Sequence, residues 1–316
     1  MPKAVDCWCD GQFQPVHRAA ISPLDRGFQY GDGIFETLRA EGGRLLFLED
    51  HLQRLAASAE DLRIPWPNID WGAVAGELLQ RNALGARAAR VKFILSRGRD
   101  PRPGLPRATR PTACVLAKAY QPPTANQYAA GWRVRLCQSV DAPALAHHKS
   151  LNYLPYLWAR QEALDAGDDE ALLLDSAGRL AEAATGALLY RLDGRWWQPA
   201  SPRQLAGITR RHVIAELARQ GMPTQERETR IEDLGQMEAL WIMNSMLGIM
   251  PVAAVDGAPL PDRQSRLATR LRRCLTTNYP EQPPRNQSIT TNDPEQRSRN
   301  QNITRNDTNA DTNGHE

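Results

Sequence analysis

The hydrophobic pattern of this 316-residue chain changes its period several times, and this constrains the fold more than any other feature. Short apolar and β-branched runs at 34–39, 89–96 and 112–119 predict strands. Between the first two runs, apolar residues recur at spacings of four and three, which predicts a helix with one apolar face: Leu48, Leu52, Leu55, Ala59 and Leu62. Strands and helices that alternate in this way indicate an α/β fold.

The second half repeats this mixture. Trp132, Val134 and Leu136 alternate with arginines, as in a half-buried strand. An amphipathic helix is expected to begin at Lys149 and to continue through Leu157, Trp158 and Leu164. The remaining elements expected are hairpins around Asp10-Gly11 and Asp193-Gly194, strands at 170–174, 239–243 and 249–255, and helices at 70–84, 208–219 and 264–278.

Length and composition suggest two domains and a tail. We expect a small N-terminal α/β domain over 1–120, a linker over 121–130 and a larger domain over 131–280. The paired prolines of the linker favour an extended, stiff connection. Residues 281–316 contain an imperfect polar repeat and only three apolar side chains, so we expect them to form a disordered tail.

Charge and cysteine content exclude several classes of function. The formal charge of +3 is small and the basic residues are dispersed, which does not favour nucleic acid as a partner. No apolar run is long enough to span a bilayer, and the N-terminus lacks the apolar core of a signal peptide. The five cysteines show neither zinc spacing nor a disulfide framework, so no metal is expected. The sequence predicts a soluble, cytoplasmic protein.

Five short strings carry a resemblance to a known family. They occur in this order: Asp25-Arg26-Gly27, Tyr30-Gly31-Asp32-Gly33, His147-His148-Lys149-Ser150-Leu151-Asn152, Glu182-Ala183-Ala184-Thr185-Gly186 and Gly207-Ile208-Thr209-Arg210. Together they resemble the fold-type-IV pyridoxal-phosphate enzymes, which include branched-chain and D-amino-acid aminotransferases and aminodeoxychorismate lyase. The resemblance covers most of residues 4–256. It implies a two-domain α/β fold with the cofactor between the domains, and a homodimer.

Pyridoxal phosphate requires an amine, a carboxylate facing its pyridine nitrogen, and a cradle for its phosphate. The resemblance assigns the Schiff-base amine to Lys149. It assigns the carboxylate to Glu182, which would hold the ring nitrogen protonated. Relatives usually carry an asparagine five residues after this glutamate, where this chain has Ala187. Taken alone, Lys149 would be read as a solvated cation and Glu182 as an exposed turn residue.

The phosphate cradle is expected from three separate places. Gly207-Ile208-Thr209 opens a helix, and free N–H groups at a helix N-terminus bind dianions. Arg54 matches the phosphate arginine of the family, and a guanidinium suits a phosphate by its fork geometry. Asn244 and Ser245 match a turn that meets the phosphate in relatives.

On the substrate side, we expect Phe35, Glu36 and Thr37 to reach the substrate, with Arg102 binding carboxylate. D-amino-acid aminotransferases carry a tyrosine at the position of Phe35 and a histidine at that of Gly104. The lyases carry a threonine that matches Thr37 and an arginine that matches Arg102, although their loop continues differently after the arginine.

The resemblance therefore implies a lyase that converts 4-amino-4-deoxychorismate to 4-aminobenzoate and pyruvate, in folate biosynthesis. Lys149 and Thr37 would be its catalytic residues. A D-amino-acid or branched-chain aminotransferase with the same Lys149 and Glu182 is the alternative. A binding or regulatory protein that kept the fold but lost catalysis is a third reading, against which the lysine and the glutamate argue.

Overall fold

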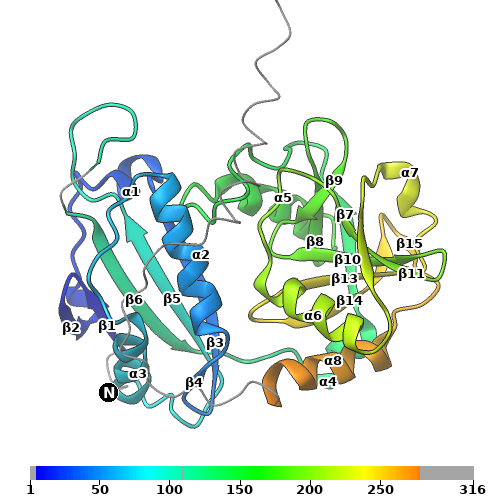
Figure 1. Cartoon of the computed structure of the whole chain (residues 1–316), viewed down its shortest axis with the longest axis horizontal. Helices are drawn as coiled ribbons and strands as arrows, with labels where there is room; N and C mark the ends of the chain where they lie inside the picture. The colour runs from blue at the N-terminus through cyan, green and yellow to red at the C-terminus, as the bar shows by residue number, and fades with distance from the viewer. Residues whose placement is uncertain (1–4, 108–109, 278–316) are drawn as a thin grey trace, which may run out of the picture. The chain divides into compact units, whose positions relative to one another are not determined.

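Two β-sheets, one from each half of the chain, form the framework of the protein (Figure 1). The computed structural model describes residues 5–107 and 110–277. The first sheet has the strand order β2-β1-β6-β5-β3-β4 and is antiparallel throughout. Its strands are β1 (Asp6–Cys9), β2 (Gln12–Pro15), β3 (Gly33–Glu41), β4 (Arg44–Leu45), β5 (Ala89–Ser96) and β6 (Thr112–Ala119).

Helices α2 (Leu48–Asp61) and α3 (Trp71–Arg81) pack on the first sheet and close its core (Figure 1). The expected apolar face of α2 is confirmed, because Leu52, Leu55 and Ala59 are buried against the sheet. Asp70 caps α3 by accepting a hydrogen bond from the Ala73 N–H at 2.9 Å. Two short helices precede β3: the 3-10 helix η1 (Val16–Arg18) and α1 (Arg26–Tyr30).

The second sheet is mixed and runs in the order β12-β11-β10-β13-β14-β7-β8-β9, with β15 paired to β14. Its strands are β7 (Trp132–Leu136), β8 (Glu170–Leu174), β9 (Leu180–Ala183), β10 (Ala187–Leu192), β11 (Arg195–Pro199), β12 (Thr224–Arg227), β13 (Ala239–Asn244), β14 (Gly248–Val255) and β15 (Ala258–Pro259). Its helices are α4 (Ala125–Ala130), α5 (Leu154–Asp165), α6 (Ile208–Arg219), α7 (Ile231–Leu234) and α8 (Ser265–Thr277). Helix α5 packs on β8, α6 on β13, and α8 on β14.

The expectation of an amphipathic helix that starts at Lys149 is wrong. Helix α5 begins only at Leu154, and its buried side consists of Tyr156, Ala159 and Ala163. Leu157 and Trp158 are 56% and 60% exposed. Small residues on the buried side allow the helix to lie close to β8, so the large apolar side chains face outward.

Strand β3, and not a helix, holds the lysine segment. The Phe35 N–H donates to the Lys149 carbonyl at 2.9 Å, and the Leu151 N–H donates to the Gly33 carbonyl at 2.8 Å. Gly33 is required at this contact, because an added Cβ would lie 2.7 Å from the Leu151 side chain and 2.8 Å from the Leu95 carbonyl oxygen. Lys149 is thus attached to the first sheet by backbone hydrogen bonds.

Most other expectations about the elements are confirmed, including both hairpins and the helix ending near 278. Within the expected linker, residues 125–130 form α4, where Thr124 and Gln127 form a capping box, so this part is not extended. The domain boundaries remain predictions. The expected tail, 281–316, lies outside the described residues, and no helix among the residues described has both the length and the apolar character needed to cross a membrane.

Candidate active site

A cavity of about 510 Å³ brings residues of the two sheets together around Lys149. We call it the lysine cavity. It is lined by the site residues expected from the sequence except Glu36 and Arg102, namely Phe35, Thr37, Arg54, Lys149, Glu182, Ile208, Thr209, Asn244 and Ser245. Its volume lies in the range of small-molecule and cofactor sites.

The Lys149 amine faces aromatic rings in a partly desolvated environment. Its Nζ lies 4.7 Å from the ring centroid of Phe35 and 5.3 Å from that of Tyr153. Burial, and after it the positive charge of Arg54, lower the pKa of Lys149 to about 8 against the pull of Glu36 and Glu182. The neutral amine, which is the form that attacks a carbonyl carbon, is therefore far more populated near neutral pH than in an ordinary lysine.

Glu182 is a buried strand residue, not an exposed turn residue. It lies on β9 and is 5% exposed. The Tyr156 hydroxyl donates to one carboxylate oxygen at 2.8 Å, and the Leu205 N–H donates to the other at 3.0 Å. Burial raises the pKa of Glu182, while these two donors oppose that shift. The carboxylate is oriented from two sides and faces the same cavity as Lys149.

The N-terminus of α6 has the features of an anion cradle. The N–H groups in the first turn of a helix have no acceptor within the helix. In α6 no side chain caps them either, because the N-cap residue is Gly207. The Thr209 hydroxyl is buried and has no hydrogen-bond partner among the described residues. Gly207 allows close packing here, because a Cβ would lie 2.8 Å from the Cβ of Ala187. An anion at this position would satisfy both the backbone donors and the hydroxyl.

Arg54 reaches the same end of the cavity from α2 and is fixed by Glu36. Its guanidinium donates two hydrogen bonds of 2.7 Å to Glu36 and a third of 2.7 Å to the Ala206 carbonyl, directly before α6. His51 contacts Glu36 at 2.7 Å and the Ser245 hydroxyl at 3.1 Å. Burial alone would raise the pKa of Glu36, but Arg54 and His51 outweigh it and lower the pKa to about 2.

This network orients Ser245. An ionised Glu36 can only accept, so the Nδ1 of His51 carries a proton. Burial lowers the pKa of His51, which favours the neutral ring, whose Nε2 then accepts from the Ser245 hydroxyl. The Asn244 side chain instead holds the turn, because it donates to the Thr185 carbonyl and accepts from the N–H groups of Met246 and Leu247. Its amide therefore shapes the turn that positions Ser245.

The expectation that Glu36 reaches the substrate is wrong, because adjacent residues of β3 point to opposite faces. Phe35 and Thr37 line the lysine cavity, whereas Glu36 is buried towards α2. Across the sheet, Thr37 pairs with Lys92 of β5. Lys92 and Arg90 also line the cavity, and we call them the cationic wall.

Lys92 is a half-buried cation with aromatic contact. Its Nζ lies 4.2 Å from the Phe35 ring centroid, and no carboxylate among the described residues pairs with it. Burial, assisted by Arg90, lowers the pKa of Lys92. A substrate carboxylate in the cavity would supply the missing counter-charge.

Arg102 is a second expected site residue that the structure does not bring to the cavity. Its side chain is 60% exposed and pairs with Asp100 at 2.6 Å. Its carbonyl accepts from Arg26 of α1 at 2.9 Å, which holds this loop beside α1. Strand β5 ends at Ser96, and Arg102 in the loop that follows does not line the lysine cavity.

The sequence reading missed several residues of the site. Tyr156 follows Tyr153 at helical spacing just after the lysine segment, and that spacing was the available signal. The contact between His51 and Glu36 gave no signal, because it joins a helix and a strand. Lys92 and Arg90 required the register of β5 against β3.

The residues of the lysine cavity fit pyridoxal phosphate. The amine and the carboxylate that this cofactor requires line one cavity. The orphaned Thr209 hydroxyl, the uncapped α6 and Arg54 gather at one end, where a phosphate would be bound.

Comparisons with known proteins agree with this geometry. Residues 33–255 match the family described as amino-transferase class IV. A putative branched-chain-amino-acid aminotransferase of Methanocaldococcus jannaschii is 32% identical over 81% of this chain and 90% of its own length. An aminodeoxychorismate lyase of Vibrio harveyi is 28% identical over 73% of this chain and 86% of its own. A solved branched-chain amino acid aminotransferase of T.th. with pyridoxamine 5'-phosphate is 26% identical, with a TM-score of 0.76 over 88% of this chain and 96% of that chain. The expected fold class is confirmed by this match.

Proposed function

The chain belongs to the class IV aminotransferase family, and we propose that it is a lyase that converts 4-amino-4-deoxychorismate to 4-aminobenzoate and pyruvate. Its cofactor is pyridoxal phosphate, in agreement with the family and with the fit of the lysine cavity. Both lyases and aminotransferases occur among its relatives, so the activity is argued from the cavity.

The observation that carries the proposal is the combination of Thr37 with the cationic wall. The proposed substrate has two carboxylates, which suit Lys92 and Arg90. A branched-chain amino acid has an apolar side chain, for which a desolvated lysine is a poor neighbour. Thr37 adds a hydroxyl to the same surface, where it can donate a proton.

In this proposal each residue has a defined role. When bound, pyridoxal phosphate supplies an electron sink for the charge that develops at the substrate carbon. Lys149 would hold the cofactor through its amine, and once the substrate amine has displaced it, the freed Lys149 amine would remove the proton from the carbon that bears the substrate amine. Thr37 or Lys149 then delivers a proton towards the departing enolpyruvyl group, which leaves as pyruvate.

The other residues hold these groups in place. Glu182 would face the pyridine nitrogen, and Arg54, Ile208, Thr209 and the turn of Asn244 and Ser245 would bind the phosphate. Phe35 packs against the Lys149 amine. The hydrogen bonds to Glu36 and to the Ala206 carbonyl keep Arg54 beside the start of α6.

We further propose a homodimer in the cytoplasm. Phe28 and Tyr30 of α1 are 74% and 66% exposed, and Leu154 at the start of α5 is 68% exposed. These segments are neighbours, since Gly31 lies against Asn152, and together they leave an apolar surface for a second copy. Arg102 lies beside α1, so we propose that it binds substrate carboxylate only in the assembled dimer. The five cysteines are free thiols, which supports a reducing compartment.

The decisive experiment incubates the pure holoenzyme with aminodeoxychorismate and no oxo acid, and measures 4-aminobenzoate and pyruvate. In parallel, D- and L-amino acids are tested with 2-oxoglutarate. Lys92→Met is expected to raise the KM for aminodeoxychorismate about tenfold or more, because a charged contact is lost. Lys118→Met is the matched control, since Lys118 is exposed on β6 and does not line the cavity.

The alternative is an aminotransferase, which the 32% identical relative favours. It would take the place of the lyase if amino acids convert the cofactor stoichiometrically to its amine form while aminodeoxychorismate is left unchanged.

A further inference from the structure

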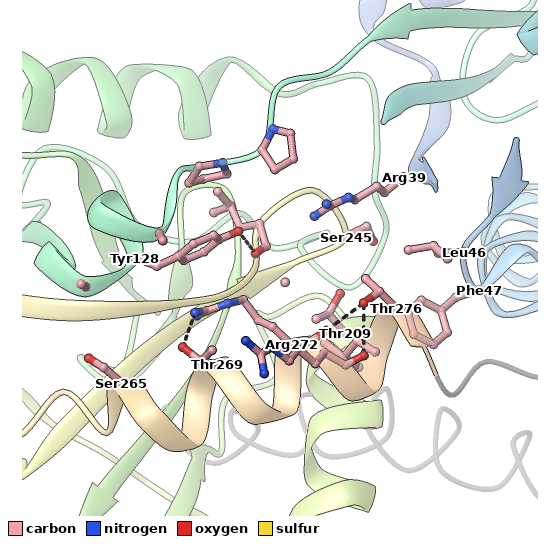
Figure 2. A pocket seen from close by; sticks show the side chains of 18 residues that line it. Arg39, Leu46, Phe47, Tyr128, Thr209, Ser245, Ser265, Thr269, Arg272 and Thr276 are labelled. Atoms are coloured by element: carbon pink, nitrogen blue, oxygen red, sulfur yellow. Dashed lines mark hydrogen bonds between the residues drawn. The ribbon is translucent and has the colours of Figure 1, made fainter. Parts of the chain in front are cut away.

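A second cavity, of about 390 Å³, adjoins the lysine cavity at Thr209 and Ser245, which line both, and Figure 2 shows the side chains around it. We call it the α8 cavity. Helix α8 contributes Thr269 and Arg272 to one side, while α4 contributes Tyr128 and β3 contributes Arg39. The described residues that line it include arginines and hydroxyl-bearing side chains but no carboxylate. Its lining therefore favours an anion.

Arg272 lines this cavity with a guanidinium that neighbouring groups hold in place. Its guanidinium donates to the Ile249 carbonyl and to the Thr269 hydroxyl, both at 2.7 Å, and lies 3.8 Å from the Tyr128 ring centroid. In the described part of the chain, no carboxylate lies within ion-pair distance of it. These contacts fix the plane of the guanidinium and leave further N–H groups for a ligand.

Arg39 differs from Arg272 in its charge balance. It is paired with Glu41 and donates to the Met246 carbonyl at 3.1 Å. Its charge is therefore largely compensated, whereas the charge of Arg272 is not. Figure 2 shows the side chains of Arg39, Tyr128 and Arg272 around the same space, with Arg272 extending from α8.

Part of the lining is apolar. Leu46 and Phe47 come from the segment between β4 and α2, Pro122 and Pro123 from the chain before α4, and Leu275 from the end of α8. A bare inorganic ion would leave these surfaces without contact. A ligand with an anionic group on an apolar body would use both parts of the cavity.

We propose that the α8 cavity binds a small organic carboxylate with an apolar or aromatic body, with the carboxylate held by the guanidinium fork of Arg272. This site is distinct from the lysine cavity, because Arg272, Tyr128 and Thr269 do not line the latter.

The two cavities share a wall, which couples them. Thr209, Ser245 and Leu247 line both. A carboxylate on one side of this wall and a phosphate on the other repel each other through poorly solvated protein. The ligand therefore weakens cofactor binding, and the cofactor weakens ligand binding by the same factor. This coupling rests on the proposed position of the cofactor phosphate, whereas ligand binding to the α8 cavity does not.

The test titrates the holoenzyme with benzoate by calorimetry, with neutral benzamide as the matched probe. We expect Arg272→Met to weaken benzoate binding at least tenfold. Arg272→Lys, which keeps the charge but loses the fork, should weaken it less. Arg266→Gln is the control on the same helix, since Arg266 is exposed and does not line the cavity. Melting temperatures of all variants report whether the fold is kept.

Benzoate can also enter the lysine cavity, so Lys92→Met is titrated as well. Binding that survives Lys92→Met and is lost in Arg272→Met supports the proposal. Binding lost only in Lys92→Met, equal binding of benzamide, or no binding at millimolar benzoate would overturn it. The coupling is measured as the pyridoxal phosphate affinity of the apoenzyme with and without benzoate. A several-fold weakening that disappears in Arg272→Met supports the coupling, and an unchanged affinity refutes the coupling alone.

Discussion

Tyr156→Phe tests how the protein sets the charge of Glu182. The substitution keeps the ring, which stacks on Tyr153 at a centroid distance of 4.8 Å, and removes only the hydroxyl. That hydroxyl donates to Glu182 at 2.8 Å, so the carboxylate would keep only the Leu205 N–H as a donor. We expect the pKa of Glu182, already raised by burial, to rise further.

The size of the effect follows from the chemistry of this contact. A hydrogen bond to a charged group contributes about 1.5–3 kcal/mol. Water can replace part of it in a cavity of this size, so the lower limit applies, and about 1.4 kcal/mol corresponds to a tenfold change in an equilibrium constant. Since a cationic pyridine nitrogen needs an ionised partner, we expect the affinity for pyridoxal phosphate to fall about tenfold.

The assay is the pyridoxal phosphate dissociation constant of the apoenzyme, followed by absorbance. Tyr153→Phe is the matched control, because the Tyr153 hydroxyl donates to the Ala184 carbonyl at 3.1 Å and not to Glu182. The reasoning is refuted if Tyr156→Phe folds normally and binds the cofactor as tightly as the unmodified chain. Equal losses in both variants would also refute it, because they would point to general packing.

Four further predictions follow from the site and the sequence. The purified protein should be yellow, and borohydride reduction with peptide mapping should place the cofactor on Lys149; a label on Lys92 or Lys118 would overturn the assignment. The rate at which the apoenzyme captures the cofactor covalently should rise with pH around a midpoint of about 8, since the neutral Lys149 amine reacts; a pH-independent rate would contradict this. Thr37→Val should lower kcat by about tenfold or more while cofactor affinity stays within about twofold, because proton transfer acts on turnover; equal effects on both would argue against a role in proton transfer. Deleting 281–316 should leave melting temperature and turnover nearly unchanged; a fall of several degrees would show that the segment packs.

The sequence by itself determined the local elements wherever one residue period dominated. Strands β5 and β6 match the expected ranges residue for residue, because their apolar runs are short and bounded by loop residues. Helix α2 was also predictable, since its apolar face follows the helical period. The short strings that resemble the family also identified some of the residues that line the lysine cavity, among them Lys149, Glu182 and Thr209.

Only the tertiary structure decided how these residues face one another. Glu36 was expected at the substrate, but the pleat of β3 directs it to His51 and Arg54 on α2. Helix α5 was expected to bury Leu157, Trp158 and Leu164, but packing on β8 buries Tyr156, Ala159 and Ala163 instead. The direction of a side chain depends on which surface of an element is covered, and the covering element lies far away in the sequence.

The site depends on the same kind of long-range information. Lys92 joins the lysine cavity because β5 pairs with β3 in a register that sets it opposite Thr37. Arg102 lies outside that cavity because its loop is held against Arg26. Residue types and spacing determined which chemistry this chain can perform, and strand register and loop anchoring decided which side chains reach one cavity. Register and anchoring arise from contacts between segments distant in sequence, and no local pattern encodes them.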